Sequence, residues 1–164
     1  MIEHFKFVCD NTEVMPKITI PAPSAIYGRP VTIPINKEIY PTLDPMFNDL
    51  GQAYRQVVRA FADAGCRYLQ LDEVFIAMLC DETYRRQMLD RGDDPSSLAE
   101  RYGDLINTAI SDIPSDMTIT MHLCRGNYKS TFMGTGGYDA VQEILFNKIN
   151  VHGYFMEYDD ERSG

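Results

Sequence analysis

The sequence predicts an α/β fold of the (β/α) barrel type, in which parallel strands alternate with helices. Three observations support this prediction. Short segments with β-branched or alternating residues take turns with longer segments of helical periodicity, an order that builds parallel sheets through right-handed crossovers. Polar residues stand at the ends of several expected strands, where such folds collect functional groups. The chain also opens in what looks like the tail of a helix and stops just past a strand, so we expect a piece of a larger barrel.

The first expected elements are a helix, a strand and a long helix. Residues 2–9 have the pattern of a helix tail. Residues 17–21 are β-branched and closed by prolines, which predicts a strand that runs into a long proline-rich loop. Between residues 44 and 64, apolar side chains recur every three or four positions, as in an amphipathic helix, and Gly65 ends this pattern.

A second strand and two further helices are expected in the middle of the chain. Residues 67–73 alternate polar and apolar side chains, which is typical of a strand. The charged stretch at residues 81–91 predicts a short surface helix. Apolar spacing over residues 98–110 predicts a longer helix, and Asp94-Pro95-Ser96 supplies its capping signal.

The last expected elements are a third strand, a helix and a fourth strand. Residues 118–124 read Thr-Ile-Thr-Met-His-Leu-Cys, and strand alternation places His122 and Cys124 together on one face. A glycine-rich loop then leads to a helix over residues 137–150, and residues 153–157 form the final strand. Strand and helix therefore alternate to the end of the sequence.

Side chains that can bind a metal stand at the ends of these strands. His122 and Cys124 end one strand, Glu157 ends another and Asp72 ends a third. Because the carboxyl ends of parallel strands meet at one rim, we expect these side chains to lie near one another. Zinc accepts nitrogen, sulfur and oxygen ligands and keeps an open position when it is catalytic. Such an ion can hold an incoming thiol as a thiolate or activate water, and the ligand set does not separate the two.

Structural roles remain open for the same residues. His122 and Cys124 can be ordinary packing residues, while Asp72 or Glu73 can cap a helix or pair with Arg67. Strand alternation favours Asp72 over Glu73 for the polar face.

Two further features could bind a ligand. Residues 134–137, rich in glycine and followed by an expected helix, could cradle a phosphate, but they lack the lysine of a P-loop, so a turn or mobile lid is favoured. Four aromatic residues in or near the expected rim loops could stack on a planar ligand; they are Tyr27, Tyr128, Phe132 and Tyr138.

Composition narrows the classes of partner. A net charge of −9 without a basic cluster disfavours nucleic-acid binding. Apolar runs are short and the first residues do not resemble a signal peptide, so we expect a soluble, cytoplasmic protein without a membrane role. A chain of this size needs no disulfide staples, so reduced thiols are expected, with Cys66 and Cys80 as packing residues.

Four segments, taken in order, resemble the catalytic C-terminal barrel of cobalamin-independent methionine synthase, and more closely its short single-barrel relatives. These segments are residues 17–24, 68–73, 121–127 and 154–163. The resemblance implies a (β/α)8 TIM barrel in which residues 1–164 form about half of one catalytic domain, roughly its third to sixth strands. It also implies that His122, Cys124 and Glu157 bind Zn2+ and that Asp72 holds the amino group of homocysteine. The fourth zinc ligand, a cysteine, and the general-acid histidine would lie outside this chain.

The implied activity is a zinc-dependent S-methyltransferase reaction. It would move a methyl group from 5-methyltetrahydrofolate, as its polyglutamate, to homocysteine and form methionine. The acidic run after Glu157 differs from that of the longer two-domain enzymes, which leaves the methyl donor open. Alternatives are alkyl transfer to another thiol such as coenzyme M, a metal-assisted hydrolase, or an inactive partial barrel whose unpaired sheet edges drive self-association.

Overall fold

Four parallel strands form one sheet in the order β1-β2-β3-β4. They are β1 (Ile18–Pro21), β2 (Tyr68–Glu73), β3 (Thr118–Leu123) and β4 (Gly153–Met156). The computed structural model describes residues 1–29, 35–127 and 129–164. Residues 30–34 of the proline-rich loop, and Tyr128 among the candidate stacking residues, lie outside the described residues. Each strand was expected within one residue of its observed ends, and Cys124 directly follows β3.

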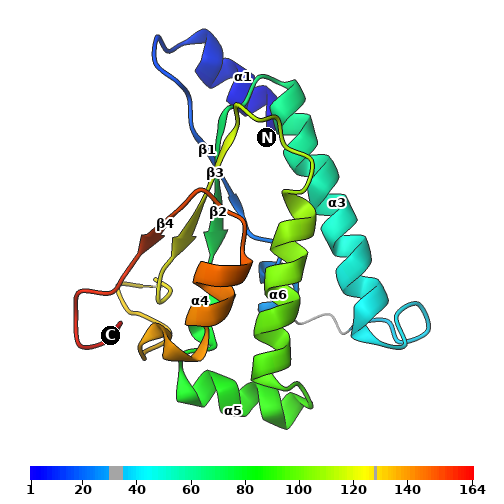
Figure 1. The fold of residues 1–164 in the computed structure, drawn as a ribbon, viewed down its shortest axis with the longest axis vertical. Helices are drawn as coiled ribbons and strands as arrows, with labels where there is room; N and C mark the ends of the chain where they lie inside the picture. Colours follow the sequence, from blue (N-terminus) through cyan, green and yellow to red (C-terminus); the bar gives the residue numbers. More distant parts are fainter. Residues whose placement is uncertain (30–34, 128) are drawn as a thin grey trace.

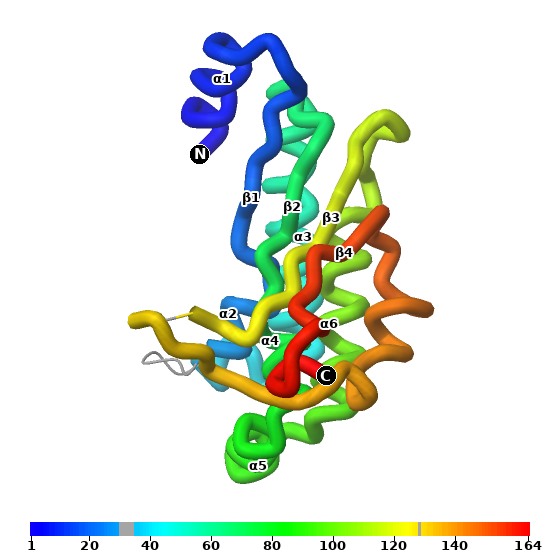
Figure 2. The backbone as a smooth tube through the Cα atoms, turned by 90° about the vertical axis from the view of Figure 1, so that its left-hand side faces the viewer, coloured from blue at the N-terminus to red at the C-terminus, as the bar shows by residue number. Residues whose placement is uncertain are grey.

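Alternation along the strands separates a buried face from a more open one. The apolar residues of β2 and β3 have no exposed surface; they are Leu69, Leu71, Ile119, Met121 and Leu123. Helices α3 (Leu43–Asp63) and α6 (Pro95–Ala109) cover this face and pack against each other. Figure 2 shows the strands side by side with these two helices behind them. The sheet and these two helices therefore form two packed layers, with the hydrophobic core between them.

The remaining long helices lie at the two ends of the sheet, as Figure 1 shows. Helix α1 (Ile2–Asp10) lies near the amino ends of the strands, where Phe5 packs edge-on against Phe61 at 6.2 Å between ring centroids. Helix α5 (Glu82–Arg91) lies at the opposite end. The caps expected from the sequence are present in α6, where Asp94 accepts a hydrogen bond from Ser97 N.

Two short helices follow the first two strands and were not expected from the sequence. They are α2 (Ala25–Gly28) and α4 (Phe75–Met78). Their close approach depends on a glycine, because a Cβ atom on Gly28 would lie 2.3 Å from Phe75 Cγ. This contact holds the two loops beyond the carboxyl ends of β1 and β2 together.

The prediction of one helix over residues 137–150 is wrong. The structure has a single 3-10 turn, η1 (Tyr138–Ala140), and a short π-helix, η2 (Ile144–Lys148). The Tyr138 hydroxyl donates to Glu157 O at 2.9 Å, which holds the first turn against the end of β4. The wider π turn, closed by Ile149 N donating to Ile144 O, buries both Ile144 and Leu145. Tertiary contacts therefore override the helical periodicity.

The α/β class and the parallel sheet are confirmed. The described strands form an open four-stranded sheet, consistent with part of a TIM-type barrel, and do not close into a barrel among themselves. No helix among the described residues is both long enough and apolar enough to cross a membrane.

Candidate functional site

The four residues expected at the strand ends lie along the carboxyl edge of the sheet. Asp72 is opposite His122 in the register of β2 and β3. Cys124 and Glu157 come one residue after β3 and β4, and Glu157 N donates to Leu123 O at 3.2 Å, so the strand pairing continues to this level. The structure thus brings the four residues to one rim, and their roles as ligands or substrate contacts stay predictions.

Asp72 and His122 are direct neighbours at this rim. His122 Nε2 lies 3.9 Å from Asp72 Oδ1, and both side chains are partly exposed. This separation is longer than a hydrogen bond, so the Asp72 carboxylate can still accept hydrogen bonds from a ligand. Arg67, the other expected partner of Asp72, pairs instead with Asp116 at 2.7 Å.

The Cys124 thiol lies in an environment that disfavours its charged form. Burial, above all, raises the pKa of the Cys124 thiol, and the negative charges of Asp72 and Glu157 raise it further, while the Gly126 N–H lowers it. The two carboxylates give the surroundings of the thiol a negative charge.

Glu157 is held by two groups at the end of the sheet. Its Oε1 accepts a hydrogen bond from Arg125 N at 3.3 Å. Its Oε2 accepts from the Arg162 guanidinium. Glu157 is therefore an ion-pair partner as well as a candidate ligand.

The donor types at this rim suit zinc, which accepts imidazole nitrogen, thiolate sulfur and carboxylate oxygen. Their arrangement is not that of an assembled site. Within the parts of the chain that the structure describes, no three or more histidine, cysteine, aspartate and glutamate side chains come together closely enough to hold a metal ion. The chemistry fits the metal, while the positions of the side chains do not yet enclose one.

Glu73, next to Asp72, has a structural role on the opposite face of β2. Its side chain is fully buried, accepts a hydrogen bond from the Ser24 hydroxyl, and accepts another from Ile76 N at 2.8 Å. Glu73 therefore caps α4 and ties the loop after β1 to the end of β2. This confirms the helix-cap alternative for Glu73.

Stability should depend on pH through Glu73. Burial, above all, raises the pKa of Glu73 from 4.5 to about 7. The folded state then binds this proton more tightly than the unfolded chain, so the stabilisation is complete below about pH 4.5, decreases as pH rises, and is lost above about pH 7. The shift corresponds to roughly 3 kcal/mol. Urea unfolding between pH 5 and 8 should show this decline in the native protein and a flatter profile in Glu73→Gln.

Asp94 and Asp160 have pKa values shifted in the opposite direction. Hydrogen bonds from the Ser97 side chain and backbone lower the pKa of Asp94, and those from Ser163 lower the pKa of Asp160. Their stabilisation is therefore present above their unfolded pKa values and is lost only at more acidic pH. Equal slopes in the native protein and in Glu73→Gln between pH 5 and 8 would contradict the prediction.

Arg125 is a buried organising residue that the sequence analysis did not single out. Its guanidinium has no exposed surface and donates to the carbonyls of Ala77, at 2.8 Å, of Gly136, and of Ser163, at 3.2 Å. It also lies 4.3 Å from the centre of the Tyr138 ring. Arg125 directly follows Cys124. Its side chain thus joins the end of β3 to α4, the glycine-rich loop and the segment after β4.

The glycine-rich loop, residues 134–137, is irregular chain packed against neighbouring segments. Its amides are already committed, because Thr135 N donates to Asp81 Oδ2 at 3.0 Å and Gly136 N donates to Arg162 O at 2.8 Å. Gly136 has a φ of +108°, and a Cβ there would lie 2.5 Å from Cys80 O. The Thr135 and Gly136 amides are therefore already bonded within the protein, which disfavours a phosphate cradle built from them.

A cavity of about 440 Å³ opens beside Glu157. It is lined by polar groups of Asn127, Ser130 and Thr131, together with Phe132 and Arg162. Of the candidate stacking residues, Phe132 therefore lies at the rim. Tyr27 is instead buried and donates to Asp93 at 2.8 Å, which makes it structural.

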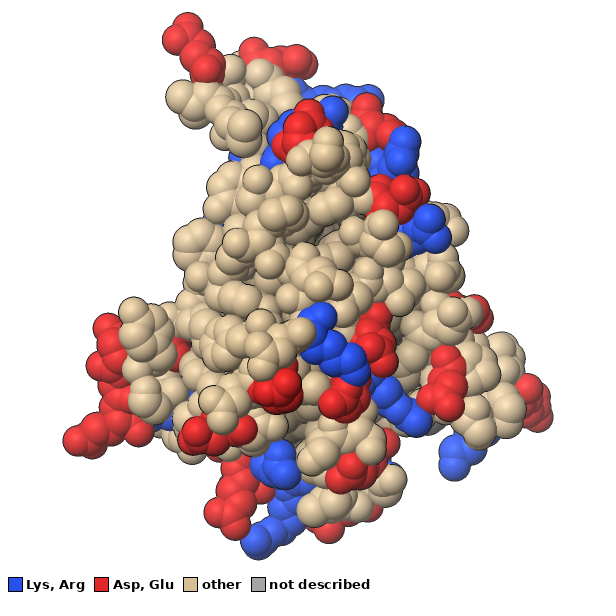
Figure 3. Space-filling model, viewed as in Figure 1, with Lys and Arg blue, Asp and Glu red and all other residues tan. Residues whose placement is uncertain are grey.

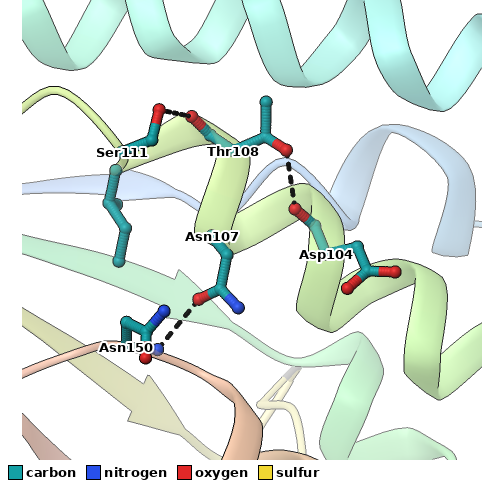
Figure 4. Close-up of a pocket in the computed structure, with 6 residues that line it drawn as sticks. Asp104, Asn107, Thr108, Ser111 and Asn150 are labelled. Carbon is teal, nitrogen blue, oxygen red and sulfur yellow. Dashed lines mark hydrogen bonds between the residues drawn. The ribbon is translucent and has the colours of Figure 1, made fainter.

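A larger cavity, of about 740 Å³, lies away from this rim, between the end of α6 and the segment before β4. Figure 4 shows that its polar side chains hydrogen-bond locally: Asn107 Oδ1 accepts from Asn150 N at 2.8 Å, and Thr108 Oγ1 donates to Asp104 O at 2.8 Å. Asn107 fastens α6 to the chain before β4. None of the four candidate residues lines it, so we place the functional site at the carboxyl rim.

Known proteins resemble the chain over most of its length. No protein-family profile matches it. Two uncharacterized proteins of Bacillus subtilis (strain 168) are similar to the chain in sequence. YxjH is 44% identical over 149 residues, which cover 91% of this chain and 39% of YxjH. YxjG is 40% identical over 166 aligned positions, which cover 100% of this chain and 43% of YxjG.

A solved structure is also similar. It is a protein of Listeria monocytogenes that is provisionally named as a vitamin-B12-independent methionine synthase. The TM-score is 0.74 with 39% sequence identity, over 96% of this chain and 44% of that protein. The chain thus spans less than half the length of each of these relatives.

Proposed function

We propose that the chain is part of one methionine synthase-like catalytic barrel, a zinc-dependent enzyme that transfers the methyl group of 5-methyltetrahydrofolate to the thiol of homocysteine. The observation that carries this proposal is the set of imidazole, thiol and carboxylate groups on neighbouring strand ends. The same chain is 39% identical to a protein provisionally named as a vitamin-B12-independent methionine synthase. Because the chain spans less than half of that protein, the proposed activity belongs to a barrel completed by further segments.

His122, Cys124 and Glu157 would hold the zinc ion, with a fourth ligand and a general acid from residues outside this chain. When bound, zinc supplies a positive charge that keeps the homocysteine sulfur as a thiolate nucleophile near neutral pH. Asp72 would bind the ammonium group of homocysteine, since its carboxylate is partly exposed and lies beside His122 without a hydrogen bond to it. Binding the acceptor at a fixed point holds its sulfur in line with the methyl donor.

The proposal is tested with the purified full-length protein, methyltetrahydrofolate and a series of thiols. Methionine should form with homocysteine, while a thiol without an amino group, such as coenzyme M, should react poorly. Asp72→Asn should raise the KM for homocysteine by about tenfold or more, as expected when one charged hydrogen bond is lost. Asp116→Asn, at the opposite end of the sheet, is the matched control and should leave KM unchanged.

Two results would contradict the proposal. Faster turnover with coenzyme M than with homocysteine would assign the site to alkyl transfer to another thiol. Hydrolysis of a substrate that homocysteine only inhibits would assign it to a metal-assisted hydrolase.

A further inference from the structure

Arg162 forms the tightest interaction that Glu157 makes. Its Nη2 donates to Glu157 Oε2, and the side chains are only 30% and 34% exposed. Partial burial strengthens such a charge-assisted bond compared with an ion pair on the open surface. The carboxylate that would bind the metal is therefore already neutralised by a cation from its own chain.

The second oxygen of Glu157 is also occupied, by the Arg125 N–H at 3.3 Å. A carboxylate with both oxygens hydrogen-bonded is a weaker metal ligand, because a metal must displace at least one partner and the cation beside it repels the incoming charge. Among the described residues no cluster of three ligands encloses an ion, and in this arrangement both Glu157 oxygens already have partners.

We propose that Arg162 is a latch on Glu157 that competes with the metal ion. Loading the site exchanges the guanidinium for the metal at the Glu157 carboxylate, and the occupancy of the site is set by the balance between the two cations. The inference rests on the proposed function, because it takes His122, Cys124 and Glu157 as the zinc ligands.

The structure provides Arg162 with other partners once Glu157 is released. Its Nη2 lies 3.3 Å from Asp160 Oδ2, and its guanidinium carbon lies 4.7 Å from the centre of the Phe132 ring. Release therefore does not strand a buried charge. The Arg162 Nε atom is buried without a hydrogen-bond partner in the present arrangement, so the guanidinium is not fully satisfied where it is.

The surrounding charge favours a metal ion over a neutral ligand. Asp159, Asp160 and Glu161 follow Glu157 after Tyr158. Figure 3 shows acidic side chains gathered at the lower left, over the segment after β4. A negative field raises the local concentration of cations, so a modest internal competitor is enough to regulate the occupancy of the site.

The test is the zinc affinity of the purified full-length protein, measured by competition with a chelating dye. Arg162→Gln should bind zinc about fivefold more tightly than the native protein, the change expected when a partly exposed ion pair stops competing. Arg162→Lys keeps the charge but loses the planar fork of donors, so a smaller gain is expected. A residue with a merely structural role would lower the affinity when replaced.

A double-mutant cycle separates the latch from general electrostatics. In a Glu157→Gln background, Arg162→Gln should no longer raise the zinc affinity, because no carboxylate is left to release. Arg55→Gln is the control for lost positive charge, since Arg55 pairs with Asp112 at 3.3 Å. An unchanged or lower affinity in Arg162→Gln, or an equal gain in Arg55→Gln or in the Glu157→Gln background, would overturn the inference.

The outcome also distinguishes the latch from the proposed function. If His122→Ala and Cys124→Ser lower the zinc affinity while Arg162→Gln does not raise it, only the latch fails. If neither ligand substitution changes the affinity, the proposed zinc site fails and the latch is overturned with it.

Discussion

Replacing His122 with alanine or Cys124 with serine is expected to abolish zinc retention through purification. Zinc sites with four protein ligands bind with about 10–16 kcal/mol, so each ligand contributes roughly 3 kcal/mol, or about 100- to 1,000-fold in affinity. Thiolate and imidazole are the strongest donors at this rim. Elemental analysis of the purified full-length protein should therefore fall from about one zinc per chain to a small fraction of that value, by the same ligand arithmetic.

His152→Ala and Cys66→Ser are the matched controls for this experiment. His152 accepts a hydrogen bond from Ile119 N at 3.0 Å through its Nδ1 atom, near the amino end of the sheet. Cys66 precedes β2 and is fully buried. Both controls should keep their zinc, and retention of zinc by both His122→Ala and Cys124→Ser would exclude the proposed site.

Most of the correct predictions about the strands and the rim follow from the alternation of side chains along a strand. The same rule that put His122 and Cys124 on one face also identifies the other face, where Leu123 is followed by Arg125 at the next inward position. A charged residue at that position needs buried partners, so the sequence contained a signal for the role of Arg125 that was not used. The same reasoning applies to Glu73, which follows Leu71 on the buried face of β2.

Other features depend on contacts between residues far apart in the sequence and could not be predicted from local patterns. The pairing of Arg162 with Glu157 requires the chain after β4 to turn back, which is held by Asp160 accepting from Ser163 N at 2.8 Å. The broken helix after residue 137 depends on Tyr138 reaching Glu157. Local propensity does not contain these contacts.

Arg125→Met should lower the free energy of unfolding by about 3–5 kcal/mol, the largest loss of stability expected for a single substitution near the rim. The carbonyls of Gly136 and Ser163 would lose this donor, and Ala77 O would keep only Cys80 N at 3.1 Å, while methionine has no donor to replace the guanidinium. Each buried acceptor without a partner costs about 1–3 kcal/mol. Removing a buried charge offsets part of that sum, because no carboxylate of the described residues pairs with the guanidinium and its desolvation is unfavourable.

The cost of leaving carbonyls without a donor opposes the gain from removing a buried charge. We expect the first to be larger, so that the protein loses stability. Backbone carbonyls cannot be removed together with the arginine, unlike the carboxylate of an ordinary buried ion pair, so the usual gain from an all-apolar replacement is not available. Urea unfolding of Arg125→Met, Arg125→Lys and the exposed control Arg86→Met should give a large, an intermediate and a negligible loss, in that order. A loss below about 1 kcal/mol in Arg125→Met would mean that water or a shift of the loops satisfies the carbonyls of Gly136 and Ser163, and that Arg125 does not hold the rim together.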